Sequence, residues 1–302
     1  DTINDIGDGF EFDKDFVLKS CLVLINLKNI AFKVDNFKKE NMLHIENDWE
    51  LISDSIKLSI ELFASFGYNE KLLTANNAVI PVAYYIMKKG NPKNFITHST
   101  YAEDRKMIRK WLNICLLKRV FGGQSDNVLT KMRESILETH SSFPLDNMVK
   151  KLKRTSKSLT FDEDEIDNLF YYQYGQNYTF STLALLYPSL DFKNRFHIDH
   201  IHPKSFFTRS KLEKMGITNI ETYMNEFNSI ANLQLLEGPV NEEKSNKLFN
   251  EWLNNNFNEE KKRIFMETHY IPNVDLTFNN FEEFIIERKK LMREKFELAL
   301  KI

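Results

Sequence analysis

The sequence is poor in residues that interrupt helices and in residues that form covalent cross-links. Its 302 residues include only 9 glycines, 7 prolines and 2 cysteines, against 25 phenylalanines. Few breakers and many large apolar residues favour a helix-rich fold with a sizeable core. Cys21 and Cys115 both lie in apolar runs, so we expect two buried thiols in a reducing compartment and no cysteine-based zinc site.

The sequence also lacks a large excess of positive or negative charge, and it lacks long apolar runs. The formal net charge is −2, so any nucleic-acid surface must come from local patches and not from bulk charge. No apolar run approaches the ~18 residues that a membrane span needs, and no signal peptide precedes the first helix. We therefore expect a cytoplasmic protein without a membrane partner. The chain starts at Asp1 without Met, and we expect it to be part of something longer.

Helical spacing of apolar residues dominates the first half of the sequence and predicts a helical domain over residues 1–155. The stretch 150–165 is polar, first basic and then acidic, and is predicted to be a linker or surface loop. The predicted helices of this half lie within residues 15–27, 47–68, 78–90, 100–123 and 126–140.

The second half alternates short helical patterns with two short strand patterns. Strands are expected near residues 195–201 and 232–236, where short apolar runs end at Pro203 and at Gly238-Pro239. A long amphipathic pattern over 278–300 predicts a C-terminal helix, within 271–302, that packs back on the body. The other helical patterns lie at 165–175, 181–190, 211–217, 220–230 and 241–257.

Three of the seven histidines gather in "RFHIDHIHPKSFF", residues 195–207. In a strand, Phe196, Ile198 and His200 would share one face, and His197, Asp199 and Ile201 the other. Alternation alone does not choose among the three histidines. It does place Asp199 and His200 on opposite faces, so the chain must distort at the strand exit for both to serve one site.

Adjacent Asp and His suit phosphodiester hydrolysis. That reaction needs a base that titrates near neutral pH, which histidine supplies. It also needs a divalent ion at the phosphate, and hard ions select oxygen ligands. Asp199 supplies one ligand and His200 the base, and Asn241, which follows Gly238-Pro239 and opens a helix, supplies a second ligand. Glu242 and Glu243 compete with Asn241 for this role.

The blocks "HIDHIHP", "NSIANLQLL" and "NEEKSNK" resemble, in this order, the signature of HNH (ββα-metal, His-Me finger) nucleases. The resemblance covers residues 195–253 and implies a nuclease domain at 156–270 that contains a small ββα motif. The expected fold class is thus mainly α, a helical bundle with this motif embedded. The resemblance implies that His200 activates water, that Asp199 and Asn241 hold one Mg²⁺ or Mn²⁺, and that Asn232 orients the loop.

The wider chain, with "FDKDFVLK", "WELISDSIKLS" and "AVIPVAYYIMKKG", is similar to the C-terminal part of GmrSD-type modification-dependent (type IV) restriction enzymes. This implies cleavage of double-stranded DNA, with modified phage DNA as a candidate substrate, in anti-phage defence. An N-terminal nucleotide-using domain precedes this part in the family, so a missing domain or a partner subunit is expected. The sequence has no DGQQR-like motif, so NTP dependence is not carried over.

A single HNH site cuts one strand, so a double-strand break predicts a homodimer or two sequential nicks.

Four further residues are candidates for supporting the site or for binding phosphate: His197, His202, Lys204 and Lys244. The alternative for each of them is a histidine or lysine on the surface without a role in the site. Two basic clusters could bind the DNA backbone, and the alternative is that they are solvated faces. The candidates for DNA binding in them are Arg105, Arg109, Lys151 and Arg154. For the whole chain, the alternatives are a binding module with an inactive nuclease block and an RNase.

Overall fold

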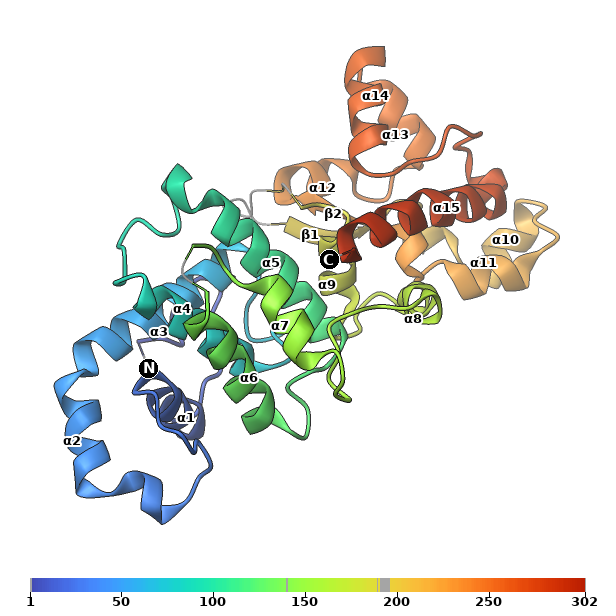
Figure 1. The fold of residues 1–302 in the computed structure, drawn as a ribbon. Helices are drawn as coiled ribbons and strands as arrows, with labels where there is room; N and C mark the ends of the chain where they lie inside the picture. The colour runs from blue at the N-terminus through green and yellow to red at the C-terminus, as the bar shows by residue number, and fades with distance from the viewer. Residues whose placement is uncertain (1, 140, 189, 191–195, 302) are drawn as a thin grey trace. The chain divides into compact units, whose positions relative to one another are not determined.

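The computed structural model describes residues 2–139, 141–188, 190 and 196–301 (Figure 1). The mainly α fold class is confirmed: these residues form fifteen α-helices and one two-stranded sheet. No helix in this described part combines the length and the apolar character required to cross a bilayer. The chain divides into two compact units, unit 1 up to Thr160 and unit 2 over Phe161–Lys301, whereas the sequence placed the division after residue 155.

Unit 1 is a bundle built around α4, in which all residues from Val79 to Ile86 are buried. This helix packs against α1, α3 and α6. Both cysteines are buried, as predicted, and burial raises the pKa of Cys21 to about 11. The helices of unit 1 are α1 (Lys14–Leu24), α2 (Lys39–Asn47), α3 (Trp49–Ser65), α4 (Val79–Lys88), α5 (Ala102–Leu117), α6 (Ser125–Leu137) and α7 (Leu145–Leu152), with 3₁₀ turns η1 (Val34–Phe37), η2 (Asn76–Ala78) and η3 (Ser99–Tyr101).

Unit 2 contains the sheet and the helices around it. Strand β1 runs antiparallel to β2, with Asp199 opposite Gln234 and His200 opposite Leu233, and α12 packs against both strands. The elements of unit 2 are α8 (Glu163–Asn168), η4 (Leu169–Tyr171), α9 (Thr179–Ala184), β1 (Phe196–His200), η5 (Lys204–Phe206), α10 (Arg209–Lys214), α11 (Ile220–Glu226), η6 (Ile230–Asn232), β2 (Leu233–Glu237), α12 (Gly238–Lys244), α13 (Phe249–Asn256), α14 (Glu259–Thr268), η7 (Phe278–Asn280) and α15 (Phe281–Leu300).

The single helix predicted over 241–257 is wrong, because α12 and α13 are separate. Ser245 has φ 44° and ψ −127°, a backbone conformation that a continuous right-handed helix does not allow. The chain therefore turns directly after Lys244. Helix α12 also begins earlier than predicted, at Gly238, with Pro239 in its first turn, where proline loses no helical hydrogen bond.

Other differences lie at the margins of the predicted elements. Helix α7 extends into the polar stretch that was predicted to be a loop from residue 150. No helix was predicted at α2 or α14. His140, Ser189, Asn194 and Arg195, at the ends of predicted elements, lie outside the described residues.

The C-terminal helix α15 holds the segment that leads into β2. Arg288 is fully buried and donates hydrogen bonds to the carbonyl oxygens of Ala231, at 2.7 Å, and of His269, at 3.1 Å. Burial lowers the pKa of its guanidinium to about 10, which leaves the group charged at neutral pH. Residues near the end of unit 2 thus fix the loop that precedes β2.

Candidate active site

His200 ends β1 and is half-buried. Its Nε2 lies 2.9 Å from Oδ1 of Asn228. An amide oxygen only accepts hydrogen bonds, so in this pairing Nε2–H donates and Nδ1 keeps its lone pair. The ring of Tyr174 lies against the imidazole, with the ring centroids 4.7 Å apart. The side chain is thereby held in one tautomer, with one nitrogen able to accept a proton.

The pKa of His200 is lowered, chiefly because burial disfavours the charged ring. The hydrogen bond to Asn228 and the charge of Asp199 act in the opposite direction, while Lys204 and Lys244 lower the pKa further. The balance keeps the imidazole neutral at physiological pH. Neutral imidazole is the form that a general base requires.

The carboxylate of Asp199 is buried, with 9% of the residue exposed. Gln234 donates from Nε2 to Oδ2 across the strand pair, at 2.8 Å. The ammonium of Lys244 lies 3.0 Å from Oδ2 and 3.2 Å from Oδ1. Both carboxylate oxygens therefore accept hydrogen bonds from within the protein.

Lys244 is completely buried, and its Nζ also donates to the carbonyl oxygen of His200, at 2.6 Å. Burial lowers the pKa of Lys244, and the charge of Asp199 opposes this shift. The ammonium thus stands as a cation among three oxygen atoms. Carboxylate and carbonyl oxygens are the donors that Mg²⁺ and Ca²⁺ select, so this group of oxygens fits a hard cation in charge and in donor type.

Asn241 lies on α12, three residues before Lys244, and is half-buried. Residues three apart share one face of a helix, so the predicted amide ligand and the observed cation lie on the same side of α12. Within the described ranges, no group of three or more His, Cys, Asp and Glu residues could hold a metal. A metal here would therefore combine Asp199 with amide, carbonyl or water oxygens. Glu242 and Glu243 are exposed.

Asn232 is fully buried, and its side chain makes hydrogen bonds to two separate backbone segments next to the site. Its Oδ1 accepts from the backbone N–H of His202, at 3.0 Å, and its Nδ2 donates to the carbonyls of His202 and Phe227, at 3.1 and 2.8 Å. Its own carbonyl accepts from the N–H of Ile201, at 2.8 Å. This geometry supports the orienting role that the resemblance implies.

The remaining histidines of the cluster lie in opposite surroundings. His197 is exposed, as is Lys204. His202 is fully buried, and its ring stands edge-on to four phenylalanines, at centroid distances of 4.7 to 6.1 Å. Burial lowers its pKa to about 3. His202 is therefore part of an aromatic core, away from any surface that phosphate could reach.

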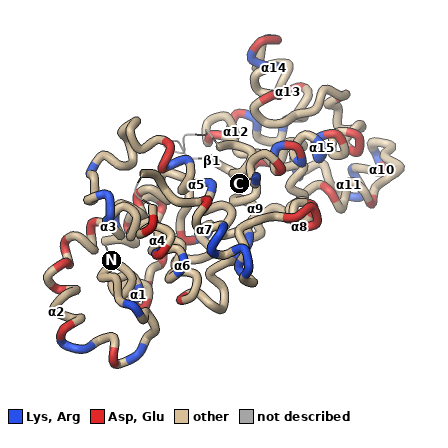
Figure 2. The backbone as a smooth tube through the Cα atoms, in the orientation of Figure 1, with Lys and Arg blue, Asp and Glu red and all other residues tan. Residues whose placement is uncertain are grey.

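The basic candidates for DNA binding in unit 1 are largely engaged within that unit. Arg105 donates to the carbonyls of Phe95 and His98, at 2.7 and 2.8 Å. Arg109 is 8% exposed, and burial lowers its pKa to about 10. Lys151 pairs with Glu138, at 2.8 Å. Arg154 is exposed, in the run of basic residues that follows α7 (Figure 2).

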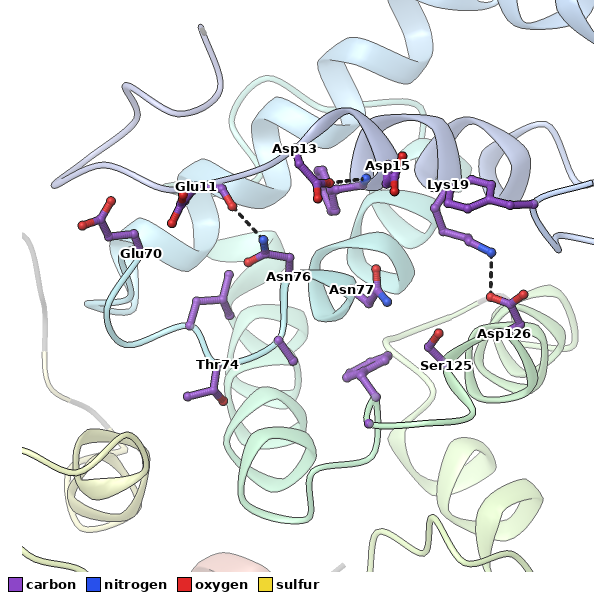
Figure 3. Close-up of a pocket in the computed structure, with 16 residues that line it drawn as sticks. Glu11, Asp13, Asp15, Lys19, Glu70, Thr74, Asn76, Asn77, Ser125 and Asp126 are labelled. Carbon is purple, nitrogen blue, oxygen red and sulfur yellow. Dashed lines mark hydrogen bonds and ion pairs between the residues drawn. The ribbon is translucent and has the colours of Figure 1, made fainter. Parts of the chain in front are cut away.

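Unit 1 also contains a cavity of about 710 Å³ with an acidic lining (Figure 3). Acidic groups repel the phosphate backbone, so this cavity does not fit DNA. Its acidic residues are Glu11, Asp13, Asp15, Glu70 and Asp126, and its basic residue is Lys19.

Sequence reasoning did not identify three contacts of the site. Asn228 is the first residue of the block "NSIANLQLL", so the motif could have indicated that it lies close to His200. The contact between Gln234 and Asp199 can be predicted only once the register of the antiparallel pair β1 and β2 is known. Tyr174 had no signal beyond its position in an aromatic run.

Residues 146–295 match the family model of the GmrSD restriction endonucleases, C-terminal domain. The matched region begins in α7 and ends in α15, and it includes β1, β2, α12 and every site residue of unit 2 described above. No curated protein matches the chain at a significant level.

Proposed function

Since residues 146–295 belong to the C-terminal domain family of the GmrSD restriction endonucleases, we propose that unit 2 is a divalent-metal-dependent DNA endonuclease of the HNH type. Its role would be the restriction of foreign or modified DNA in the cytoplasm. One observation carries the chemistry: His200, with Nε2 engaged by Asn228 at 2.9 Å, ends β1 directly after Asp199, whose carboxylate is buried, and α12 packs against both strands.

In this proposal His200 accepts the proton of the attacking water at Nδ1. The hydrogen bond to Asn228 fixes the tautomer, and burial keeps the ring neutral and ready to accept. Asn232 holds the backbone on either side of the base. Asp199 and Asn241 would hold Mg²⁺ or Mn²⁺, which supplies positive charge at the scissile phosphate and at the leaving oxygen.

The proposed substrate is double-stranded DNA, with modified phage DNA as the candidate within that class. One site of this kind cuts one strand at a time, so a double-strand break would require a homodimer or two successive nicks. A domain that recognises the modification would lie upstream or on a partner subunit. NTP dependence is no part of the proposal, because the sequence contains no nucleotide-binding motif.

The decisive experiment compares plasmid cleavage by the wild type and by His200→Ala, with Mg²⁺, with Mn²⁺ and with EDTA. Removing a general base reduces rates by about 10²- to 10⁴-fold, and EDTA is expected to abolish cleavage. His197→Ala is the matched control, because His197 lies on the same strand but is exposed. Equal cleavage by wild type and His200→Ala would refute the assignment.

The alternatives give different results in the same assay. Tight DNA binding without cleavage in any divalent metal would indicate a binding module with an inactive nuclease block. Faster cleavage of RNA than of DNA, with the same dependence on His200, would indicate an RNase.

A further inference from the structure

The ammonium of Lys244 occupies the position of a cation in the proposed metal site. Nζ lies 3.0 and 3.2 Å from the two carboxylate oxygens of Asp199 and 2.6 Å from the carbonyl oxygen of His200. Lys244 is fully buried and Asp199 is 9% exposed. The negative charge of Asp199 is thus already balanced from within the protein.

We infer that Lys244 and a divalent ion compete for Asp199, so that the ion binds only when the ammonium of Lys244 leaves the carboxylate. This inference rests on the proposed function, because it concerns the same metal site. It assigns to Lys244 a role that differs from a phosphate contact: the side chain closes the site against metal in the resting protein.

Electrostatics requires the competition. A metal bound to a carboxylate oxygen and an ammonium at about 3 Å from the same oxygen would face each other with little water between them. Repulsion between like charges is strongest where water is excluded. The third acceptor of the ammonium is a neutral backbone carbonyl, which opposes that repulsion with a single hydrogen bond, at 2.6 Å.

The local structure allows the exchange. The lysine stem is a flexible four-carbon chain, and the backbone leaves the helix directly after it, at Ser245. Asn241 lies on the same face of α12. A rearrangement of the Lys244 side chain alone would therefore exchange an internal cation for a metal beside the second ligand.

Direct measurement of metal binding tests the inference. Calorimetric titration of the full chain with Mn²⁺ compares wild type, Lys244→Met and the matched control Lys247→Met. The control removes the same charge from an exposed position three residues further on. Lys244→Met is expected to bind Mn²⁺ at least about tenfold more tightly than wild type, and Lys247→Met to bind as wild type does. Asp199→Asn is expected to weaken binding in both the wild-type and the Lys244→Met backgrounds.

A second measurement uses the wild type and does not depend on whether the variant folds. An amine-reactive reagent, read by peptide mass spectrometry, reports the accessibility of each lysine. Labelling of Lys244 is expected to be low in EDTA and to rise at saturating Mn²⁺, while labelling of Lys247 stays constant. Lys244 labelling that remains low at saturating Mn²⁺ would overturn the inference.

The possible outcomes distinguish failure of the inference about Lys244 from failure of the proposed metal-dependent function. Equal or weaker Mn²⁺ binding by Lys244→Met, with metal-dependent cleavage intact in the wild type, would overturn the inference alone. Absence of Mn²⁺ binding in both proteins, together with cleavage that is insensitive to EDTA, would overturn the inference and the metal-dependent function together.

Discussion

Among the described residues, each unit buries one lysine, and the two lysines make nearly the same contacts. Lys19 in unit 1 donates to the carbonyl of Ile30, at 2.6 Å, and to Asp126, also at 2.6 Å, the contact that Figure 3 shows. Lys244 in unit 2 donates to a carbonyl at 2.6 Å and to Asp199 at 3.0 Å. The carboxylates differ: the side chain of Asp126 is 43% exposed and that of Asp199 is 9% exposed.

That difference separates a structural ion pair from a candidate ion-binding site. Water screens Asp126, so the pair in unit 1 links α1 to α6 with a modest contribution to stability. Asp199 has no such screening and depends on the cation beside it. The same two chemical groups therefore link two helices in unit 1, whereas in unit 2 we propose that they belong to the site of the reaction.

The described residues of the two units also differ in whether they include buried histidines. His202 and His269 of unit 2 are buried, and burial lowers the pKa of each to about 3. In the described part of unit 1, His44 and His98 are exposed. Protonation of His202 and His269 in mild acid is therefore costly for the folded state of unit 2.

The largest expected effect is selective loss of unit 2 at low pH. Both folded pKa values lie below the ordinary value of 6.5, so between pH 6.5 and 3 the unfolded chain binds more protons and stability falls as the pH falls. Two such histidines give about 2.7 kcal/mol per pH unit, or about 5 kcal/mol from pH 6.5 to 4.5. Hydrogen exchange followed by mass spectrometry of the full chain would show unit 2 opening first, and His202→Leu is expected to reduce the slope by about half. Simultaneous opening of both units would contradict the comparison.

Removal of the two buried lysines is the next test. Lys244→Met leaves Asp199 buried without a counter-charge, which we expect to cost about 3–5 kcal/mol of unfolding free energy in EDTA. Lys19→Met leaves Asp126 partly in water, and about 1 kcal/mol is expected. Denaturant titration measures both. A cost for Lys19→Met as large as that for Lys244→Met would show that exposure of the carboxylate does not decide the outcome.

The smallest expected effect concerns two asparagines that each contact one ring. Asn228→Ala removes the partner of His200 Nε2 and is expected to lower kcat about tenfold with KM unchanged, because about 1.4 kcal/mol is a typical hydrogen-bond contribution. Asn113→Ala in unit 1 removes the acceptor of the Tyr68 hydroxyl, at 2.5 Å. It is expected to cost about 1–3 kcal/mol of stability and to leave kcat unchanged. Stability curves and cleavage kinetics of both variants distinguish these effects.

The sequence predicts the helical character and the ββα order, because these depend on local periodicity and on three short blocks near one another in the chain. It does not predict the pairing of Asp199 with Lys244, which are 45 residues apart and meet only once β1, β2 and α12 have packed. Similarly, the phenylalanines around His202 come from α13, η7 and α15, so its burial is a property of the tertiary fold. Arg109 lies in a run of basic residues that is typical of a solvated face, yet it is buried, because helix packing and not residue type decides which side faces inward.

Arg288 determines how much of the chain the site requires. The motif recognisable in the sequence ends near residue 253, but the loop that precedes β2 is held from α15, through the carbonyl of Ala231 at 2.7 Å. A fragment cut at the motif boundary would lack this support and would expose the aromatic cage of His202. The smallest portable module is therefore the whole of unit 2, and transfer of this unit to another protein would have to carry the chain through Leu300.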